Sequence, residues 1–351
     1  MNKFIAVFFL LVSLLIFPKL AHASEEVLEG TVIQIIEEST IHQKLILRVD
    51  RGSIKGESIQ VDNGNEYVSA NIFFKENDKL VLASFEDEVG NPDYIITDYV
   101  RRDELLALFI LFVFLVILIG RFWGLASLVG MAISFFIIFS FILPMILKGY
   151  DAVLISIIGS IIIIPATFGI SHGFNRKTFY AMLGTIITLV ITGLLSIFFV
   201  EATHLTGYAS EEAGFLSSAL GTVVNVKGIL LAGMIIATLG ILDDITISQA
   251  SIVNELKSAN SKLTNAKLFA KAMNVGRDHI SSLVNTLVLV YTGASLPLLL
   301  LFLESERSFL EVINYELIAD EIVRTLVGSI GLVLAVPITT AIAVYFGNKN
   351  A

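Results

Sequence analysis

Residues Gly228–Leu256 read GILLAGMIIATLGILDDITISQASIVNEL and join a membrane-spanning segment to a helix with polar side chains at helical spacing. Two adjacent acids, Asp243 and Asp244, lie inside this stretch, the first about 22 Å along a helix axis from Gly228 at ~1.5 Å per residue. A carboxylate at membrane depth costs at least ~2.5 kcal/mol to insert. The stretch therefore indicates a multi-pass membrane protein with a candidate site at the acid pair.

The composition supports this class. The 351 residues are 55% hydrophobic and 16% charged, with a mean hydropathy of +0.83, whereas soluble domains are about 25% charged. There is no cysteine, which excludes disulfides, thiolate metal sites and a cysteine nucleophile. The five histidines are scattered without metal-ligand spacing, so neither a metal nor another cofactor is predicted.

The chain begins with a segment, residues 1–23, that resembles a secretory signal. Lys3 precedes an apolar run from Phe4 to Phe17, and Ala21-His22-Ala23 forms an A-x-A site. The alternative is an uncleaved first span, although the run is shorter than the ~20 residues that crossing needs. Either interpretation places the next segment outside the cytoplasm.

Residues 24–98 have the pattern of a small β domain. Their 16 acids and 6 bases give a net charge of −10, while the rest of the chain sums to +1. This acidity argues against nucleic acid as a partner. Turn residues separate runs rich in β-branched and aromatic side chains, so we expect five or six short strands closing into a β-barrel or OB-like fold. With no basic groove, a structural or protein-docking role is favoured over ligand binding. The runs are GTVIQI at 30–35, KLILRV at 44–49, YVSANIF at 67–73 and KLVLAS at 79–84.

Residues 99–351 are predicted to form an all-α transmembrane bundle of about seven spans. The spans are expected at Leu105–Gly120, Leu125–Leu147, Ala152–Gly169, Phe179–Val200, Gly228–Gln249, Ile280–Phe302 and Thr325–Phe346. The distribution of Lys and Arg predicts a membrane protein with the β domain outside and the C-terminus in the cytoplasm. Lys148 and the pair Arg101-Arg102 are the exceptions to this orientation.

Two loops are long enough to be structured. In the outer loop, Phe215–Gly221 is apolar and is expected to dip toward the bilayer edge. The inner loop, residues 255–279, alternates apolar side chains with regularly spaced lysines, which predicts an amphipathic helix at the headgroups or against the bundle. Its basic face is interpreted as an orientation signal and lipid contact, and a regulatory or partner site is the alternative.

Asp243 and Asp244 are the leading candidates for chemistry. Two adjacent carboxylates cannot both ionise cheaply at low dielectric, so one is expected to hold a proton and to act as a relay. The alternative is a hydrogen-bonded pair near the cytoplasmic surface that stabilises the bundle. Ser248, Ser251 and Glu255 extend the polar seam toward the cytoplasm.

A second polar group begins with GRDH at 276–279 and ends in the following span. Asn285 is predicted at a depth comparable with Asp243 and is the candidate hydrogen-bond partner of an aspartate across helices. Arg277 and Asp278 either support this seam or anchor the helix at the interface. Both interpretations remain open.

The blocks GILDDITISQASIVNEL, NVGRDHISSLVNTLVLVYTGASLPLLL and DYVRRDELLALF resemble the YibE/F-like family of bacterial multi-pass membrane proteins, from about Gly30 to Phe346. That resemblance implies topology more than activity. A weaker similarity is to the transmembrane domains of resistance–nodulation–division transporters and of SecD-SecF. It implies a proton-relay position for Asp243 or Asp244 and a partner position for Asn285.

Two functions follow from these features. The first is an ion-coupled transporter or export-associated protein that uses the aspartate pair on a small ion or solute. The alternative is a non-catalytic scaffold or partner subunit that docks another protein through the outer β domain. An enzyme is not expected, because Asp243 follows Gly240-Ile241-Leu242 rather than the Gly-x-Gly context of an intramembrane aspartyl protease.

Overall fold

The computed structural model describes residues 27–40, 42–64, 73–86, 92–220, 225–304 and 307–347. The described chain divides at Gly120 into two compact units, one containing the β domain and the other the helical bundle. The predicted signal segment, residues 1–23, lies outside the described residues.

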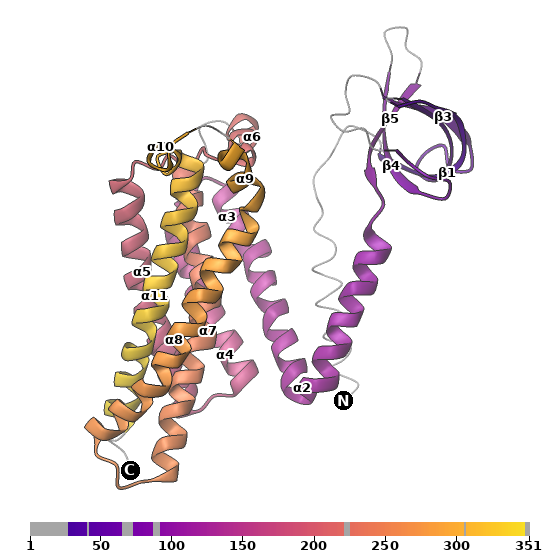
Figure 1. Ribbon diagram of the computed structural model, residues 1–351. Helices are drawn as coiled ribbons and strands as arrows, with labels where there is room; N and C mark the ends of the chain where they lie inside the picture. Colours follow the sequence, from indigo (N-terminus) through magenta and orange to yellow (C-terminus); the bar gives the residue numbers. More distant parts are fainter. Residues whose placement is uncertain are drawn as a thin grey trace. The chain divides into compact units, whose positions relative to one another are not determined.

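The first unit is built on a five-stranded antiparallel sheet with the order β3-β2-β1-β4-β5 (Figure 1). Alternation along the strands places apolar side chains such as Leu28, Leu47 and Leu82 in one core. The buried side chain of Gln43 exchanges two hydrogen bonds with the backbone of Phe74, at 2.8 and 2.9 Å. The strands are β1 Val27–Glu38, β2 Gln43–Arg51, β3 Ser58–Asn63, β4 Lys79–Glu86 and β5 Pro92–Tyr99.

Five strands are confirmed, but the prediction of a closed barrel or OB-like fold is wrong. Among the described residues no ladder joins β3 to β5, so the sheet stays open. Alternation reports which face of a strand is buried, but closure depends on register and bulges that alternation does not encode. Most of the expected strand at 67–73 lies outside the described residues.

The ion pairs of this unit account for two of the unexpected positive charges. Arg101 lies 2.6 Å from Asp98, and Arg102 lies 2.6 Å from Glu29. The Arg101 guanidinium lowers the pKa of the Asp98 carboxyl. Both arginines are therefore neutralised by acids of the acidic segment, which explains why they depart from the charge rule at this end of the first span.

The second unit is a bundle of apolar helices that begins within α2, at Gly120. Five helical segments are long and apolar enough to cross a membrane, or six if α8 and α9, bent by 66°, are counted as one broken span. The helices are α2 Arg102–Ile137, η1 Ile138–Ile142, α3 Leu143–Leu147, α4 Ala152–His172, α5 Arg176–Ala202, α6 Glu211–Leu220, α7 Val226–Ala259, α8 Asn265–Ala294, α9 Leu296–Glu304, α10 Phe309–Val312 and α11 Glu316–Gly347.

The first candidate span, Arg102–Leu147, is 46 residues long, about twice what one crossing needs. The backbone leaves the helical region at Arg121, where φ is 50° and ψ is −127°. This break falls between the predicted spans Leu105–Gly120 and Leu125–Leu147. Helical residues thus cover the seven predicted spans, except for the turn at Ser295 within Ile280–Phe302.

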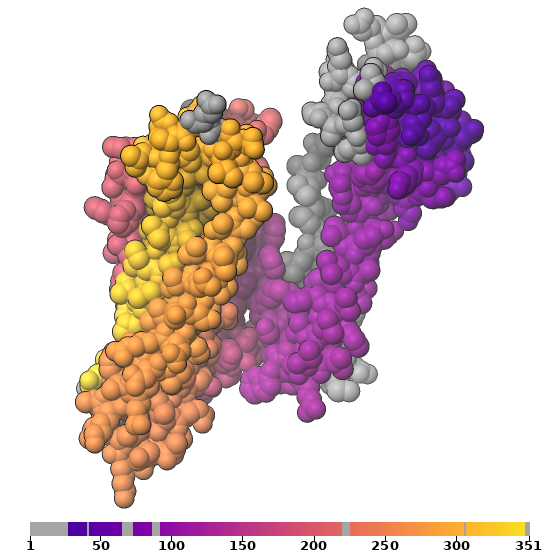
Figure 2. All heavy atoms as spheres, in the orientation of Figure 1, coloured from indigo at the N-terminus to yellow at the C-terminus, as the bar shows by residue number. Residues whose placement is uncertain are grey.

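Close approach of α5, α7 and α11 forms the centre of the bundle, where these helices and α8 run side by side (Figure 1). At two contacts between α5 and α11, a glycine of one helix leaves room for a threonine side chain of the other. A Cβ on Gly184 would lie 2.2 Å from Thr339 Oγ1, and one on Gly331 would lie 2.5 Å from Thr192 Oγ1. Figure 2 shows α8 in orange and α11 in yellow along one face of this unit.

Candidate functional site

A cavity of about 520 Å³ lies between α2, α4 and α7, within the second unit. Both aspartates of the central stretch line it. Its other polar residues come from two helices that the sequence did not connect to the acids. The lining residues are Trp123, Ser127, Gly130, Met131, Ser134, Thr167, Phe168, Ser171, His172, Asp243, Asp244 and Ile247.

The packing of α7 determines which side chains reach the cavity. Leu242, Ile245 and Thr246 are buried on its other faces. Thr246 Oγ1 lies 2.7 Å from Thr185 Oγ1 of α5, which fixes the rotation of α7 at this level. Because successive helical residues point ~100° apart, Asp243 lies at the border between packed core and cavity.

The opposite wall is made by α2 and α4, which approach closely at Gly130. A Cβ there would lie 3.1 Å from Ser171 Oγ. Thr167 Oγ1 donates to the carbonyl of Ile163 at 3.0 Å, and Ser134 Oγ donates to the carbonyl of Gly130 at 3.1 Å. Each hydroxyl oxygen keeps lone pairs that can accept from a ligand or water in the cavity.

Asp243 is the unusual group of this site. Its Oδ1 atom is fully buried and has no hydrogen-bond partner among the described residues, while Asp244 is the more exposed acid. An ionised carboxylate buried without a partner is unfavourable by several kcal/mol. The arrangement therefore favours occupation of the Asp243 carboxyl by a proton, a water molecule or a cation.

The lining chemistry limits what this cavity can hold. No Lys or Arg lines it within the described part of the chain, and His172 is its one other titratable group there. The described residues contain no group of three His, Cys, Asp or Glu side chains placed to hold a metal ion. Carboxyl and hydroxyl oxygens beside the ring of Trp123 form a surface suited to protons and cations.

The other predicted residues lie apart from the cavity. Asn285 is exposed on α8 and does not line it. Ser251 Oγ donates to the carbonyl of Ile247 on its own helix at 2.7 Å. Glu255, Arg277 and Asp278 are exposed near the end of α7 and on α8, while Ser248 is half-buried.

Sequence reasoning missed the contribution of α4. Its small polar residues Ser156, Ser160, Thr167 and Ser171 recur on one helical face, and that spacing was a usable signal. The histidine that follows, His172, has no second histidine at metal-ligand spacing, so the sequence predicts no metal site there. A lone histidine next to such a face is a better indication of a proton site than of a metal site.

Gln249 is a second residue that sequence reasoning missed. It is fully buried, and its amide nitrogen donates to the carbonyl of Ala272 at 3.1 Å and to Thr340 Oγ1 at 2.7 Å. It thereby joins α7 to α8 and α11. Gly276 provides the necessary room, since a Cβ there would lie 3.0 Å from the Gln249 Oε1 atom.

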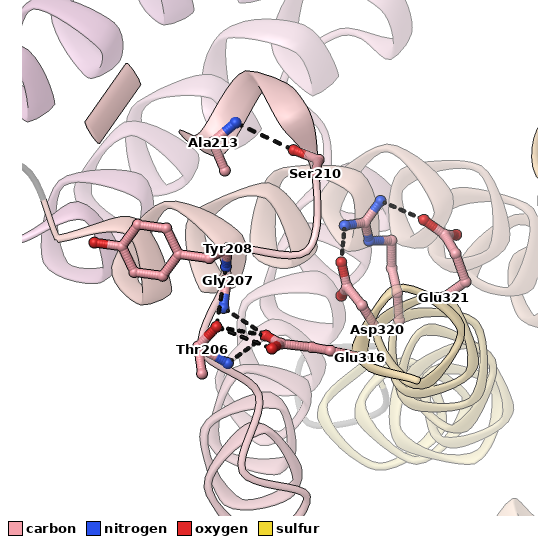
Figure 3. A network of polar contacts seen from close by, with 9 residues as sticks. Thr206, Gly207, Tyr208, Ser210, Ala213, Glu316, Asp320 and Glu321 are labelled. Atoms are coloured by element: carbon pink, nitrogen blue, oxygen red, sulfur yellow. Dashed lines mark hydrogen bonds and ion pairs between the residues drawn. The ribbon is translucent and has the colours of Figure 1, made fainter. Parts of the chain in front are cut away.

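A network of hydrogen bonds and ion pairs lies at the end of the bundle where α11 begins (Figure 3). The Glu316 carboxylate accepts hydrogen bonds from Thr206 Oγ1 at 2.8 Å and from the Gly207 N–H at 2.9 Å. About two turns further along α11, Arg324 pairs with Asp320 at 3.1 Å and with Glu321 at 3.2 Å. This cluster shares no residue with the cavity.

The described helices thus form a bundle of candidate membrane spans in which an unpartnered carboxylate oxygen belongs to a residue that lines a polar cavity. Residues 108–349 match the profile of the family described as YibE/F-like protein. The chain belongs to that family, which confirms the resemblance. Neither the curated proteins nor the solved structures that were searched gave a match.

Proposed function

We propose that this protein is an ion-coupled membrane transporter in which Asp243 and Asp244 carry the coupling proton or cation. The observation that carries the proposal is the buried, unpartnered Oδ1 atom of Asp243 in a cavity of about 520 Å³. Intramembrane carboxylates that face a cavity mark ion and proton pathways.

The chemistry of coupling follows from the positions of the two acids. Asp243 lies against the core and Asp244 toward the more open side, so an ion can pass between groups of different accessibility. Their proximity disfavours simultaneous ionisation. His172 and the hydroxyls of Thr167 and Ser171 accept or donate hydrogen bonds to whatever occupies the cavity.

Complementation tests this function. The gene is deleted, growth is screened over metals, osmolytes, antimicrobials and pH, and the defect is then restored with wild type, Asp243→Asn, Asp244→Asn or Glu255→Gln. We expect at least one asparagine variant to insert at wild-type abundance and yet fail to rescue. Glu255→Gln is the matched control, because this exposed acid lies on the same helix outside the cavity.

If both asparagine variants rescue fully, an ionisable group is not required and the coupling role is lost. The second candidate, a scaffold docking through the outer domain, would then be favoured. It is supported by the exposed apolar side chains Val27, Ile33 and Ile36 along β1. In that case Ile33→Lys with Ile36→Lys should abolish rescue while the asparagine variants do not.

A further inference from the structure

A second, smaller pocket of about 180 Å³ lies at the end of the bundle where α5 begins and where α7 and α11 end. Three basic side chains line it, Arg176 and Lys177 from the first turn of α5 and Lys257 from the last turns of α7. The positive-inside count predicts that this end faces the cytoplasm. The pocket shares no residue with the cavity around Asp243.

The floor of this pocket is apolar and comes from three helices. Val253 of α7, Leu268 of α8 and Val344 of α11 all line it and are almost fully buried. Packed helices therefore form the floor of the pocket, while Arg176 is exposed and Lys177 and Lys257 are half-buried. Its volume corresponds to about six water molecules at ~30 Å³ each, enough for one phosphate group.

The electrostatics of the pocket favour an anion. No acidic side chain lines it within the described residues. The 27-residue helix α5 begins here, and the Asn175 side chain accepts from the N–H of Thr178 at 3.0 Å. The remaining N–H groups of that turn have no partner inside the helix, so they and the helix dipole add to the positive potential.

We propose that this pocket binds the phosphate group of an anionic ligand. A guanidinium, an ammonium and a helix N-terminus converging on one small space form a phosphate-binding arrangement. The shared chemistry comes from two sources, the headgroup of an acidic phospholipid or free phosphate. A basic pocket between membrane helices over an apolar floor suits the headgroup, and the experiment separates the two.

The test is native mass spectrometry of the full chain, purified in an uncharged detergent. The probes are dioleoylphosphatidylglycerol, dioleoylphosphatidylcholine and inorganic phosphate. We expect phosphatidylglycerol to be retained in preference to phosphatidylcholine. The double variant Arg176→Gln/Lys177→Gln should bind it roughly 30-fold more weakly, because each basic group near a phosphate contributes about fivefold.

The matched control is Lys262→Gln/Lys267→Gln, which removes the same charge from exposed positions at the same end of the bundle and outside the pocket. It should keep wild-type binding. If the double pocket variant does not fold, Lys177→Gln alone should weaken binding about fivefold. The elution profile and unfolding temperature establish folding in each case.

The outcomes separate the sources of phosphate. If phosphate alone raises the unfolding temperature of wild type but not that of the pocket variant, the site binds free phosphate. Retention of phosphatidylglycerol that millimolar phosphate does not displace assigns it to the lipid headgroup. The proposal is overturned if the pocket and control variants lose phosphatidylglycerol binding equally. It is also overturned if wild type binds neither phosphatidylglycerol nor phosphate.

Discussion

Two glycines, Gly184 and Gly331, allow the central helices α5 and α11 to approach closely. Gly184 on α5 accommodates the side chain of Thr339, and Gly331 on α11 accommodates Thr192, so the same contact occurs in both directions. Small residues at helix contacts allow the close backbone approach that van der Waals packing in a membrane requires. The rotations of α5 and α11, and through them the position of Asp243, depend on these two sites.

Gly184→Ala is expected to destabilise the bundle by about 1–3 kcal/mol, because the new methyl group overlaps Thr339 Oγ1 and approaches its backbone at 3.3 Å. The unfolding temperature in detergent measures the effect. The matched control is Gly233→Ala, where nothing lies within 4 Å of the new Cβ. That change should be neutral or stabilising by up to ~1 kcal/mol, because alanine is the better helix former. A loss of equal size in both variants would contradict this packing.

Among the elements, α8 is attached to the bundle by apolar packing and by the buried side chain of Gln249. The amphipathic segment predicted over 255–279 comprises the end of α7, a connection at 260–264 and the first half of α8. Leu268 and Ala272 on the apolar face of α8 are buried against the bundle. Gln249 fixes the register of this contact through the Ala272 carbonyl. The first turns of α8 therefore belong to the helical core.

Gln249→Leu keeps the side-chain volume but removes both hydrogen bonds to α8 and α11. We expect a loss of about 1 kcal/mol, a typical value for an interhelical hydrogen bond in a membrane. Amide hydrogen exchange should accelerate in the first half of α8. Ser251→Ala is the control, because that hydroxyl bonds only its own helix, and exchange there should stay at the wild-type rate. Equal protection of α8 in both variants would show that Gln249 does not hold it.

Glu316 at the start of α11 binds the loop that contains Thr206 and Gly207. Removing its carboxylate with Glu316→Ala eliminates the hydrogen bonds that the backbone N–H groups of Thr206 and Gly207 donate to it. Hydrogen bonds to charged groups contribute about 1.5–3 kcal/mol, so exchange of these two amides should rise at least tenfold. The control is Glu311→Ala, an outer acid that caps only its own short helix α10. If exchange at 206–207 is unchanged in Glu316→Ala, other contacts hold the loop.

At the scale of the whole molecule, hydropathy located the helices because each span carries its own signal. Alternation located β1, β2 and β4, since that pattern is local, but β3 and β5 are not among the predicted runs. The partners of Asp243 were not predictable in this way. A sequence shows which face of a helix is polar but not which helix that face meets, so Asn285 was chosen for its depth while α2 and α4 form the cavity. The prediction of a closed barrel is wrong for a related reason, because the register between distant strands has no local signature.

The most direct test of ion coupling is the reaction of Asp243 with dicyclohexylcarbodiimide in native membranes. This apolar reagent adds to a protonated carboxyl group and leaves an N-acylurea that peptide mass spectrometry locates. We predict an adduct on Asp243 that declines as pH rises or as a coupling cation is added, with little adduct on the exposed Glu255. Absence of an Asp243 adduct, or equal labelling of Glu255 at every pH, would show that Asp243 is not a proton-exchanging group at membrane depth.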